Sequence, residues 1–306
     1  MAESATPSVD VLMPYYGDVA LMQESVRSVL AQSDPDWHLT VVDDGEAAGV
    51  PEWFAALDDP RVTYLRNEVN LGVSGNFQKC VGLARRDRMV MLGCDDLLMP
   101  DYVARIRELE RRLPGVGLIQ PGVEVIDEHG QPAAGLTDTV KRRRYAPKEL
   151  LAPAGTVTME GEALALSLLR GNWLYFPSLC WRTDAVKASR GFRQDLSVVQ
   201  DLAVIIELVE KGERLLADSV PAFRYRRHAG SVSSKHAVDG SRFDESRRFF
   251  TETANRLDGI GWHRAALVAR RQRSTRLHAL TLAPFALGQR DTETFRRLLR
   301  YAAANR

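Results

Sequence analysis

Two pairs of neighbouring carboxylates stand directly after short apolar segments of this chain. The pair Asp43–Asp44 follows residues 39–42, and the pair Asp95–Asp96 follows residues 89–92. Adjacent carboxylates repel each other, so each pair is most stable beside a divalent cation or a sugar hydroxyl. Mg²⁺ or Mn²⁺ bound in this way commonly bridges to phosphate oxygens. An ordinary surface turn is the other interpretation of either pair, because Asp favours turns.

A third carboxylate, Asp201, stands at the start of an apolar stripe with helical spacing. The stripe consists of Leu202, Ile205, Ile206 and Val209. A helix dipole favours an anion at the helix N-terminus, which predicts an ionised and weakly basic Asp201. Such a group can act as a general base, worth about 10²–10⁴-fold in rate, or it can simply cap the helix.

Alternating strands and helices must position these acids. Periodicity predicts strands at Val9–Met13, Leu39–Val42, Val62–Leu65 and Met89–Leu92. Helices are predicted at 22–30, 76–84, 101–113 and 162–169. Parallel neighbours need long crossovers, so this order predicts a largely parallel sheet with helices on both faces. Ligands of such sheets bind beyond the carboxyl ends of the strands, where both acidic pairs fall.

Two further regions differ from this pattern. Residues 127–161 are rich in Gly, Pro and Thr and contain the basic run Lys141–Arg144, which predicts a mobile loop. Beyond residue 240 the chain is predicted to be helical, with an apolar stripe at Phe295, Leu298, Leu299 and Ala302. Residues 235–306 hold 15 Lys and Arg against 7 Asp and Glu. This basic tail can pair with the acidic remainder, form a homodimer contact or attract an anionic membrane surface.

The composition is that of a globular protein. The chain has 306 residues, 45% hydrophobic and 26% charged, with a net charge of +1, which argues against disorder, a coiled coil and general nucleic-acid binding. Its three cysteines support neither a disulfide framework nor a zinc cluster, and no apolar run approaches the ~18–20 residues of a membrane span. A cytoplasmic protein is therefore expected. GxGxxG and GxxxxGK[ST] motifs are missing, which argues against dinucleotide oxidoreductases and P-loop enzymes.

An ordered series of short motifs spans roughly residues 8–230. It consists of Pro14–Tyr16, Ser28–Gln32, Val42–Gly45, Asn70–Ser74 with Asn76, and Leu92–Asp96 followed by Pro100. The series resembles the family 2 nucleotide-sugar glycosyltransferases of the GT-A fold. This resemblance implies an α/β fold with a Rossmann-like, mostly parallel sheet, flanking helices and a C-terminal helical extension. It implies a nucleotide-sugar-binding half over 1–125, an acceptor-binding and catalytic half over 126–234, and the basic extension over 235–306.

The same resemblance implies an inverting transferase that uses a UDP-, dTDP- or GDP-sugar with Mg²⁺ or Mn²⁺. Its setting would be the assembly of envelope polysaccharide, lipid-linked glycan or small glycoconjugates. The implied donor-binding residues are Pro14, Tyr15, Tyr16, Asp43, Asp44, Asn70, Gly72, Asn76, Asp95, Arg226 and Arg227. The implied metal ligands are Asp96, Asp95 and His228. Many members have a further Asp where this chain has Gly93, which leaves the number of bound ions open.

The second half of the chain is expected to complete the site. The segment 199–206 resembles the family's Glu-Asp segment, which implies that Asp201 is the general base although Gln200 replaces the Glu. Asn172 and Trp173 stand where members of the family bind the acceptor. An aromatic ring suits the apolar face of a sugar, and a core position is an equally good interpretation of Trp173.

Two other functions fit parts of the sequence. Nucleotidyltransferases also join a parallel sheet to metal-bound carboxylates, but they usually carry a Gly-rich loop with Lys or Arg where this chain has Met13–Gly17. A non-catalytic nucleotide-sugar binder is suggested by Gly93 and Gln200, which replace acids. Turnover of a donor separates a transferase from a binder.

Overall fold

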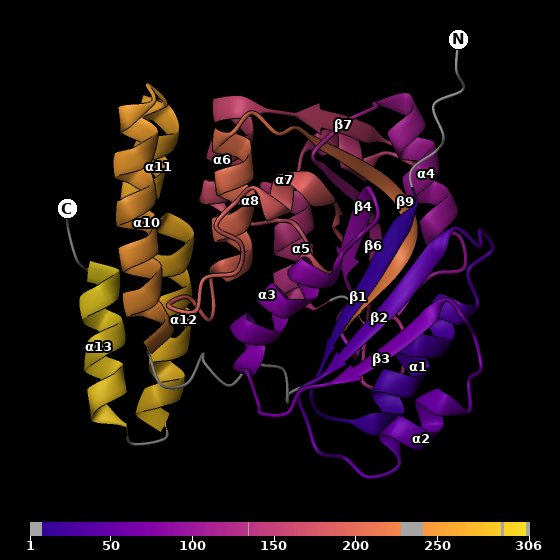
Figure 1. Cartoon of the computed structure of the whole chain (residues 1–306). Helices are drawn as coiled ribbons and strands as arrows, with labels where there is room; N and C mark the ends of the chain where they lie inside the picture. Colours follow the sequence, from indigo (N-terminus) through magenta and orange to yellow (C-terminus); the bar gives the residue numbers. More distant parts are fainter. Residues whose placement is uncertain (1–7, 134, 228–240, 289–290, 304–306) are drawn as a thin grey trace.

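The computed structural model describes residues 8–133, 135–227, 241–288 and 291–303. A nine-stranded sheet forms its centre, with strand order β3-β2-β1-β4-β8-β6-β9-β5 and with β7 paired to β9 (Figure 1). The strands are β1 (Val9–Tyr15), β2 (Trp37–Asp43), β3 (Val62–Arg66), β4 (Arg88–Met91), β5 (Leu97–Leu98), β6 (Leu118–Ile126), β7 (Thr156–Met159), β8 (Cys180–Arg182) and β9 (Leu215–Arg226). The expected α/β class is therefore confirmed.

The sheet is parallel in its first half and mixed in its second. Strands β1 to β4 pair with one another in parallel, as predicted. Strand β8 is antiparallel to both β4 and β6, and β5 and β7 are antiparallel to β9. The expectation of a mostly parallel sheet therefore holds for β1–β4, whose carboxyl ends place both acidic pairs at one edge.

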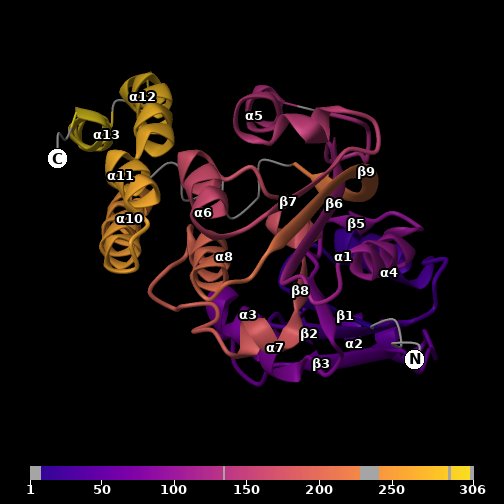
Figure 2. The same cartoon turned by 90° about the horizontal axis from the view of Figure 1, so that it is seen from above.

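Helices cover both faces of the sheet, as Figures 1 and 2 show. They are α1 (Val19–Leu30), α2 (Val50–Ala55), α3 (Gly72–Leu83), α4 (Tyr102–Arg112), α6 (Gly161–Arg170), α7 (Thr183–Lys187) and α8 (Gln200–Glu210). Alternation along β1 explains the two layers, because successive strand residues point to opposite faces. Val11 and Met13 pack in the core that contains α1 and α4, whereas Leu12 packs in the core that contains α3, α6 and α8.

The segment predicted to be a mobile loop has regular structure, so that prediction is wrong. It contains α5 (Leu136–Val140), a π-helical turn η1 (Lys141–Tyr145), a 3₁₀ turn η2 (Lys148–Leu151) and β7. Its order comes from partners distant in the sequence: Asp138 pairs with Arg227, and Lys141 donates to the carbonyl of Leu174. A local pattern of Gly and Pro cannot reveal such contacts.

The C-terminal region is helical, as expected. It contains α10 (Ser241–Gly259), α11 (His263–Arg271), α12 (Arg273–Gly288) and α13 (Thr292–Ala303). Helix α11 packs on α6, where Glu162 accepts from the backbone of Arg264, and α12 and α13 form a small core around Phe243. No helix among the described ranges is long and apolar enough to cross a bilayer. The proposed boundary at 125/126 lies at the end of β6, inside the shared sheet, and the three-part division stays a prediction.

Candidate functional site

The turn after β4 brings the carboxylates of Asp95 and Asp96 together. A Cβ on Gly93 would lie 2.6 Å from Asp96 Oδ2 and 3.0 Å from Asp95 Oδ1, so both oxygens converge over this glycine. Asp96 is 1% exposed, and its Oδ1 accepts from the backbone N–H of Arg226 at 2.8 Å. Burial, followed by the charge of Asp95, raises the pKa of Asp96 well above its ordinary value.

These two carboxylates fit a hard divalent cation. Mg²⁺ and Mn²⁺ prefer oxygen ligands, and a cation would relieve the repulsion that raises the pKa of Asp96. Within the described part of the chain, no group of three or more His, Cys, Asp or Glu side chains is arranged to hold a metal. His228, the third expected ligand, lies outside the described residues.

Arg226 fastens the acidic turn to β9. Its Nε donates to the carbonyl of Asp95 at 2.8 Å, and its Nη2 donates to Glu24 Oε2 at 2.8 Å. Its Nη1 donates to the carbonyls of Asp127 and Glu128 at 3.3 and 3.1 Å. The residue is 3% exposed. Every guanidinium nitrogen has a protein acceptor, so the expected contact with the donor diphosphate has no support here and a positioning role fits the contacts.

Asp43 is also held inside the protein. Its side chain is buried, and Oδ2 accepts from Nε and Nη2 of Arg66 at 2.9 and 2.8 Å. Oδ1 accepts from the backbone N–H of Gly45 at 2.9 Å. These contacts fix the turn after β2 and use both oxygens of the Asp43 carboxylate.

Asp44 anchors the segment that leads into α3. Its Oδ1 accepts from Asn67 Nδ2 at 2.6 Å and from the N–H of Leu71 at 2.8 Å. Asn70 donates to the Asp44 carbonyl at 2.8 Å and accepts from the N–H of Gly72, whose φ of +68° favours glycine. The predicted residues Asp44, Asn70 and Gly72 are thus brought together around one loop.

The remaining predicted donor residues differ in exposure. Asn76 is buried and donates to the carbonyl of Val42 at 2.9 Å, which ties α3 to β2. Tyr15 is buried, and its hydroxyl donates to the carbonyl of Gly17 at 3.1 Å. Tyr16 is 68% exposed, so its ring can stack on a planar base. Pro14 is half-buried within β1 and adds no polar group.

Asp201 lies in the first turn of α8, as predicted, but its expected weak basicity is wrong. Burial raises its pKa, and this effect outweighs both the hydrogen bond from the N–H of Leu202 and the charge of Lys141. The helix N-terminus is therefore not the dominant influence. Gln200, the residue before it, accepts from Ser74 Oγ at 2.9 Å and so joins α8 to the start of α3.

A network near Asp201 contains Arg227, which was a predicted donor residue, and three residues that no site prediction included: Lys141, Asp138 and Tyr175. Lys141 Nζ lies 4.2 Å from the ring centre of Tyr175 and donates to the carbonyl of Leu174 at 3.0 Å. Burial lowers the pKa of Lys141 to about 8. Asp138 accepts from Arg227 through two hydrogen bonds of 2.7 Å and from the Tyr175 hydroxyl at 2.9 Å. The basic run 141–144 was the only signal, and it suggested a loop.

Aromatic contacts connect this network to the acidic turn. The rings of Tyr175 and Tyr225 lie 5.3 Å apart, and the Arg227 guanidinium lies 5.4 Å from the Tyr225 ring. Burial and then the charge of Asp96 raise the pKa of Tyr225 to about 12. Tyr225 therefore senses both the acidic turn and the ion pair of Arg227 with Asp138.

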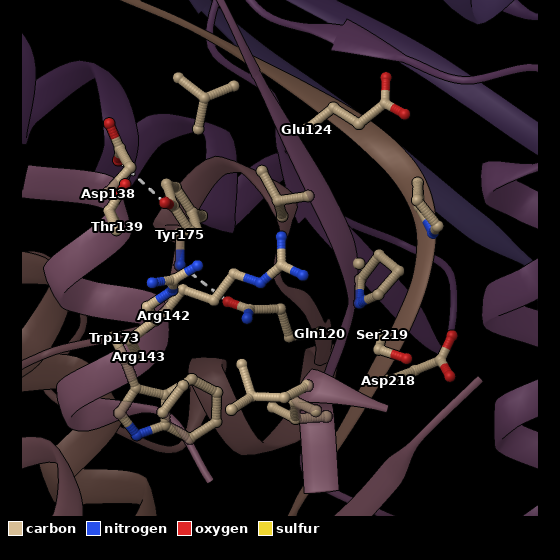
Figure 3. A pocket seen from close by; sticks show the side chains of 18 of the residues that line it. Gln120, Glu124, Asp138, Thr139, Arg142, Arg143, Trp173, Tyr175, Asp218 and Ser219 are labelled. Carbon is tan, nitrogen blue, oxygen red and sulfur yellow. Dashed lines mark hydrogen bonds between the residues drawn. The ribbon is translucent and has the colours of Figure 1, made fainter. Parts of the chain in front are cut away.

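Of the two expected acceptor residues, only Trp173 lines a cavity, whose volume is about 1040 Å³ (Figure 3). Trp173 lines it and is only 3% exposed, and its Nε1 donates to Ser167 Oγ at 3.1 Å. Trp173 is thus both a core residue and part of a cavity wall. Asn172 accepts from the N–H of Leu174 at 3.2 Å and shapes the turn beside it.

Residues 10–137 match the family model described as Glycosyl transferase family 2. This part of the chain is therefore similar to a glycosyl transferase family 2 domain. This domain includes both acidic pairs and the loop around Asp44, in agreement with the resemblance seen in the motifs.

Curated relatives extend the similarity beyond the family 2 domain. The chain is 26% identical over 211 residues to an uncharacterized protein, MT1568, of Mycobacterium tuberculosis, covering 67% of this chain and 63% of that one. It is 25% identical over 234 residues to the succinoglycan biosynthesis protein ExoO of Rhizobium meliloti, covering 76% and 64%. The chain therefore spans a little under two thirds of these relatives. It is also 28% identical over 100 residues to the putative colanic acid biosynthesis glycosyl transferase WcaA of Escherichia coli, covering 32% and 36%.

Solved structures share the fold of the family 2 domain and its surroundings. Residues 1–349 of S. aureus TarS match with a TM-score of 0.67 at 11% identity, covering 97% of this chain and 81% of that chain. The complex of that protein with UDP-GlcNAc matches with a TM-score of 0.63 at 12% identity, covering 96% and 91%. At this identity the likeness establishes the GT-A fold.

Proposed function

We propose that this chain is an inverting glycosyltransferase that moves a sugar from a nucleotide-diphospho-sugar to an acceptor hydroxyl. The observation that carries the proposal is the convergence of Asp95 and Asp96 over Gly93, at the carboxyl edge of β4 within a family 2 domain. The relatives named for succinoglycan and colanic acid biosynthesis support a polysaccharide setting, and the UDP-GlcNAc complex of TarS supports a nucleotide-sugar donor.

In this proposal the donor lies along the carboxyl edge of β1 to β4. Tyr16 stacks on the base, Asp44 faces the nucleoside, and Asp95 and Asp96 hold Mg²⁺ or Mn²⁺. A bound divalent ion would neutralise charge on the departing diphosphate. The Arg227 guanidinium, 40% exposed at its side chain, is paired with Asp138, and its contact with the donor stays a part of the proposal.

Asp201 takes the proton of the attacking hydroxyl. A bond forms between the acceptor oxygen and C1 of the sugar, the bond from C1 to the diphosphate oxygen breaks, and the proton moves to the Asp201 carboxylate. Because burial raises the pKa of Asp201, this carboxylate is a stronger base than an exposed aspartate. Attack from the face opposite the leaving group inverts C1, and no covalent intermediate with the protein is needed.

Four finer expectations belong to the same proposal. The base of the donor is uracil, thymine or guanine, and the reaction takes place in the cytoplasm or at the inner face of the membrane. The basic tail attracts that membrane or forms a homodimer contact. No nucleic acid takes part.

Donor turnover tests the proposal. UDP-, dTDP- and GDP-sugars are offered with and without Mn²⁺, and release of nucleoside diphosphate and the thermal shift are measured together. A ligand at 100 times its Kd adds about 2.7 kcal/mol to stability, so the correct nucleotide should give a large shift only with metal. Asp96→Ala should abolish the metal-dependent part, while Asp201→Ala should keep donor binding and lose transfer.

The outcomes separate the alternatives. Transfer that survives Asp201→Ala removes this residue as the base. Tight, metal-dependent donor binding without turnover identifies a non-catalytic binder, and release of pyrophosphate from a nucleoside triphosphate identifies a nucleotidyltransferase.

A further inference from the structure

The cavity beside Trp173 is built from several distant parts of the chain. It lies between β6 and the segment that contains α5, η1 and η2, and its volume is about 1040 Å³. Binding sites for small molecules commonly measure about 300–1,000 Å³. The lining includes Gln120, Arg142, Arg143, Trp173 and Tyr175, and Figure 3 shows these side chains around one space.

The cavity presents hydrogen-bond donors that lack protein partners. Neither Arg142 nor Arg143 donates to, or forms an ion pair with, any residue that the structure describes. Gln120 is 6% exposed, and its Oε1 accepts from the N–H of Tyr175 at 2.7 Å. Its amide nitrogen has no acceptor among the described residues and is not sealed off from the cavity. All three groups can donate hydrogen bonds to the acceptor oxygens of a ligand.

The acidic residues of the lining are already neutralised. Each of them has an arginine partner outside η1, at distances of 2.7, 3.4 and 2.8 Å. These pairs are Asp138 with Arg227, Glu124 with Arg224, and Asp218 with Arg105. The two η1 arginines therefore give the cavity an uncompensated positive charge, which favours an anionic ligand.

We propose that this cavity binds the acceptor and that the acceptor is an acidic glycan. Its carboxylate or phosphate group meets Arg142, Arg143 and the amide of Gln120, and the apolar face of a sugar ring lies against Trp173. This inference rests on the proposed transferase function, and it names the chemical class of the substrate that receives the sugar.

The position of the cavity relative to Asp201 fits this role. Arg142 follows directly on Lys141, whose charge acts on the Asp201 carboxylate. Tyr175 also lines the cavity next to Lys141, and its hydroxyl shares Asp138 with Arg227. An acidic group held at η1 would thus direct a hydroxyl of the same glycan toward the proposed base.

Three probes that differ only at C6 test the proposal: glucose, glucuronate and glucose 6-phosphate. Their affinities for the full chain are measured by ligand-observed NMR at constant ionic strength, with Mn²⁺ and nucleoside diphosphate present. We expect one acidic probe to bind at least about tenfold more tightly than glucose. Preference for glucuronate indicates a uronic acid acceptor, and preference for glucose 6-phosphate indicates a phosphorylated one.

Variants in η1 provide the control. Arg142→Ala and Arg143→Ala should each weaken the acidic probe about 10- to 100-fold, the effect of removing a hydrogen bond to a charged group, and should leave glucose unchanged. Arg144→Ala is the matched control, because Arg144 is exposed on the same turn but does not line the cavity. Equal binding of the three probes, or an equal loss in Arg144→Ala, overturns the proposal.

A second measurement distinguishes failure of the acceptor assignment from failure of the proposed transferase function. Mn²⁺-dependent hydrolysis of the donor by water needs no acceptor, so the unmodified chain and the control Arg144→Ala should both show it. Hydrolysis without selectivity for an acidic probe refutes only the acceptor assignment. Selective binding of an acidic probe without any nucleotide binding or hydrolysis refutes the transferase.

Discussion

Replacing Lys141 by Met should make the protein more stable at neutral pH. Burial lowers the pKa of the Lys141 ammonium from 10.5 to about 8, and a difference of this size corresponds to about 3 kcal/mol against the charged form. The variant removes that penalty but loses the hydrogen bond to the Leu174 carbonyl, worth about 1 kcal/mol. We therefore expect a net gain of about 2 kcal/mol in the free energy of unfolding below pH 7.

The sign of the pH dependence follows from the same two pKa values. Below pH 8 Lys141 is protonated in both the folded and the unfolded chain, so the penalty is complete. Between pH 8 and 10.5 the unfolded chain binds more protons than the folded one, so the unmodified protein gains stability as the pH rises. The advantage of Lys141→Met should shrink across this interval. Urea unfolding at pH 6.5 and pH 10 measures it, with the exposed Lys148→Met as control.

Lys141→Met should also change the pH profile of transfer. The charge of Lys141 lowers the pKa of Asp201, so its removal should move the acid limb of kcat/KM to higher pH. A variant that is destabilised at pH 6.5 contradicts the free-energy penalty for burying the Lys141 charge. A variant that folds normally but keeps the acid limb in place contradicts the coupling of Lys141 to Asp201.

Three further changes probe the donor loop and η1. Asn76→Ala removes a buried hydrogen bond between α3 and β2, and should lower the free energy of unfolding by about 1–3 kcal/mol in urea titrations. A Cβ on Gly171 would lie 2.6 Å from the ring of Tyr145, so Gly171→Ala should displace η1 and cost about 1–3 kcal/mol. Gly82→Ala is the control, because no atom lies within 4 Å of a Cβ at Gly82, and it should not destabilise the protein. Equal melting temperatures for the two variants contradict the packing of Tyr145 against Gly171. Tyr16→Ala should change the free energy of unfolding by no more than about 0.5 kcal/mol, because Tyr16 is exposed. It should weaken nucleotide binding, measured by calorimetry, about 5- to 100-fold, which is the range for loss of stacking on a base. An unchanged affinity removes Tyr16 from the donor site.

Local patterns in the sequence were enough to predict the first half of the sheet. Alternating apolar residues and helical stripes involve only near neighbours along the chain, so they predicted β1, β2, β3 and β4 and the helices α1 and α3 within a few residues, but not the short α2. Since parallel strands end at a common edge, the same patterns were sufficient to place Asp44, Asp95 and Asp96 at that edge. The order of the short motifs is also a property of the sequence alone, and the resemblance that it indicated agrees with the family match over residues 10–137.

Which charged groups are available for chemistry depends on the tertiary structure. Arg226 and Asp43 have the types expected for donor contacts, yet both are bonded within the protein to partners that local sequence does not reveal. Asp201 is a stronger base than its helix position alone predicts, because burial depends on packing by the whole fold.

The segment around η1 shows this limit most clearly. Asp138 and Arg227 are 89 positions apart, and their ion pair orders a stretch whose composition suggested a loop. Hydrogen bonds and desolvation depend on distances in space, whereas periodicity reports only on neighbours along the chain. The strands and helices that carry the site could therefore be predicted from the sequence. The charge states and the hydrogen-bond partners of the site residues could not.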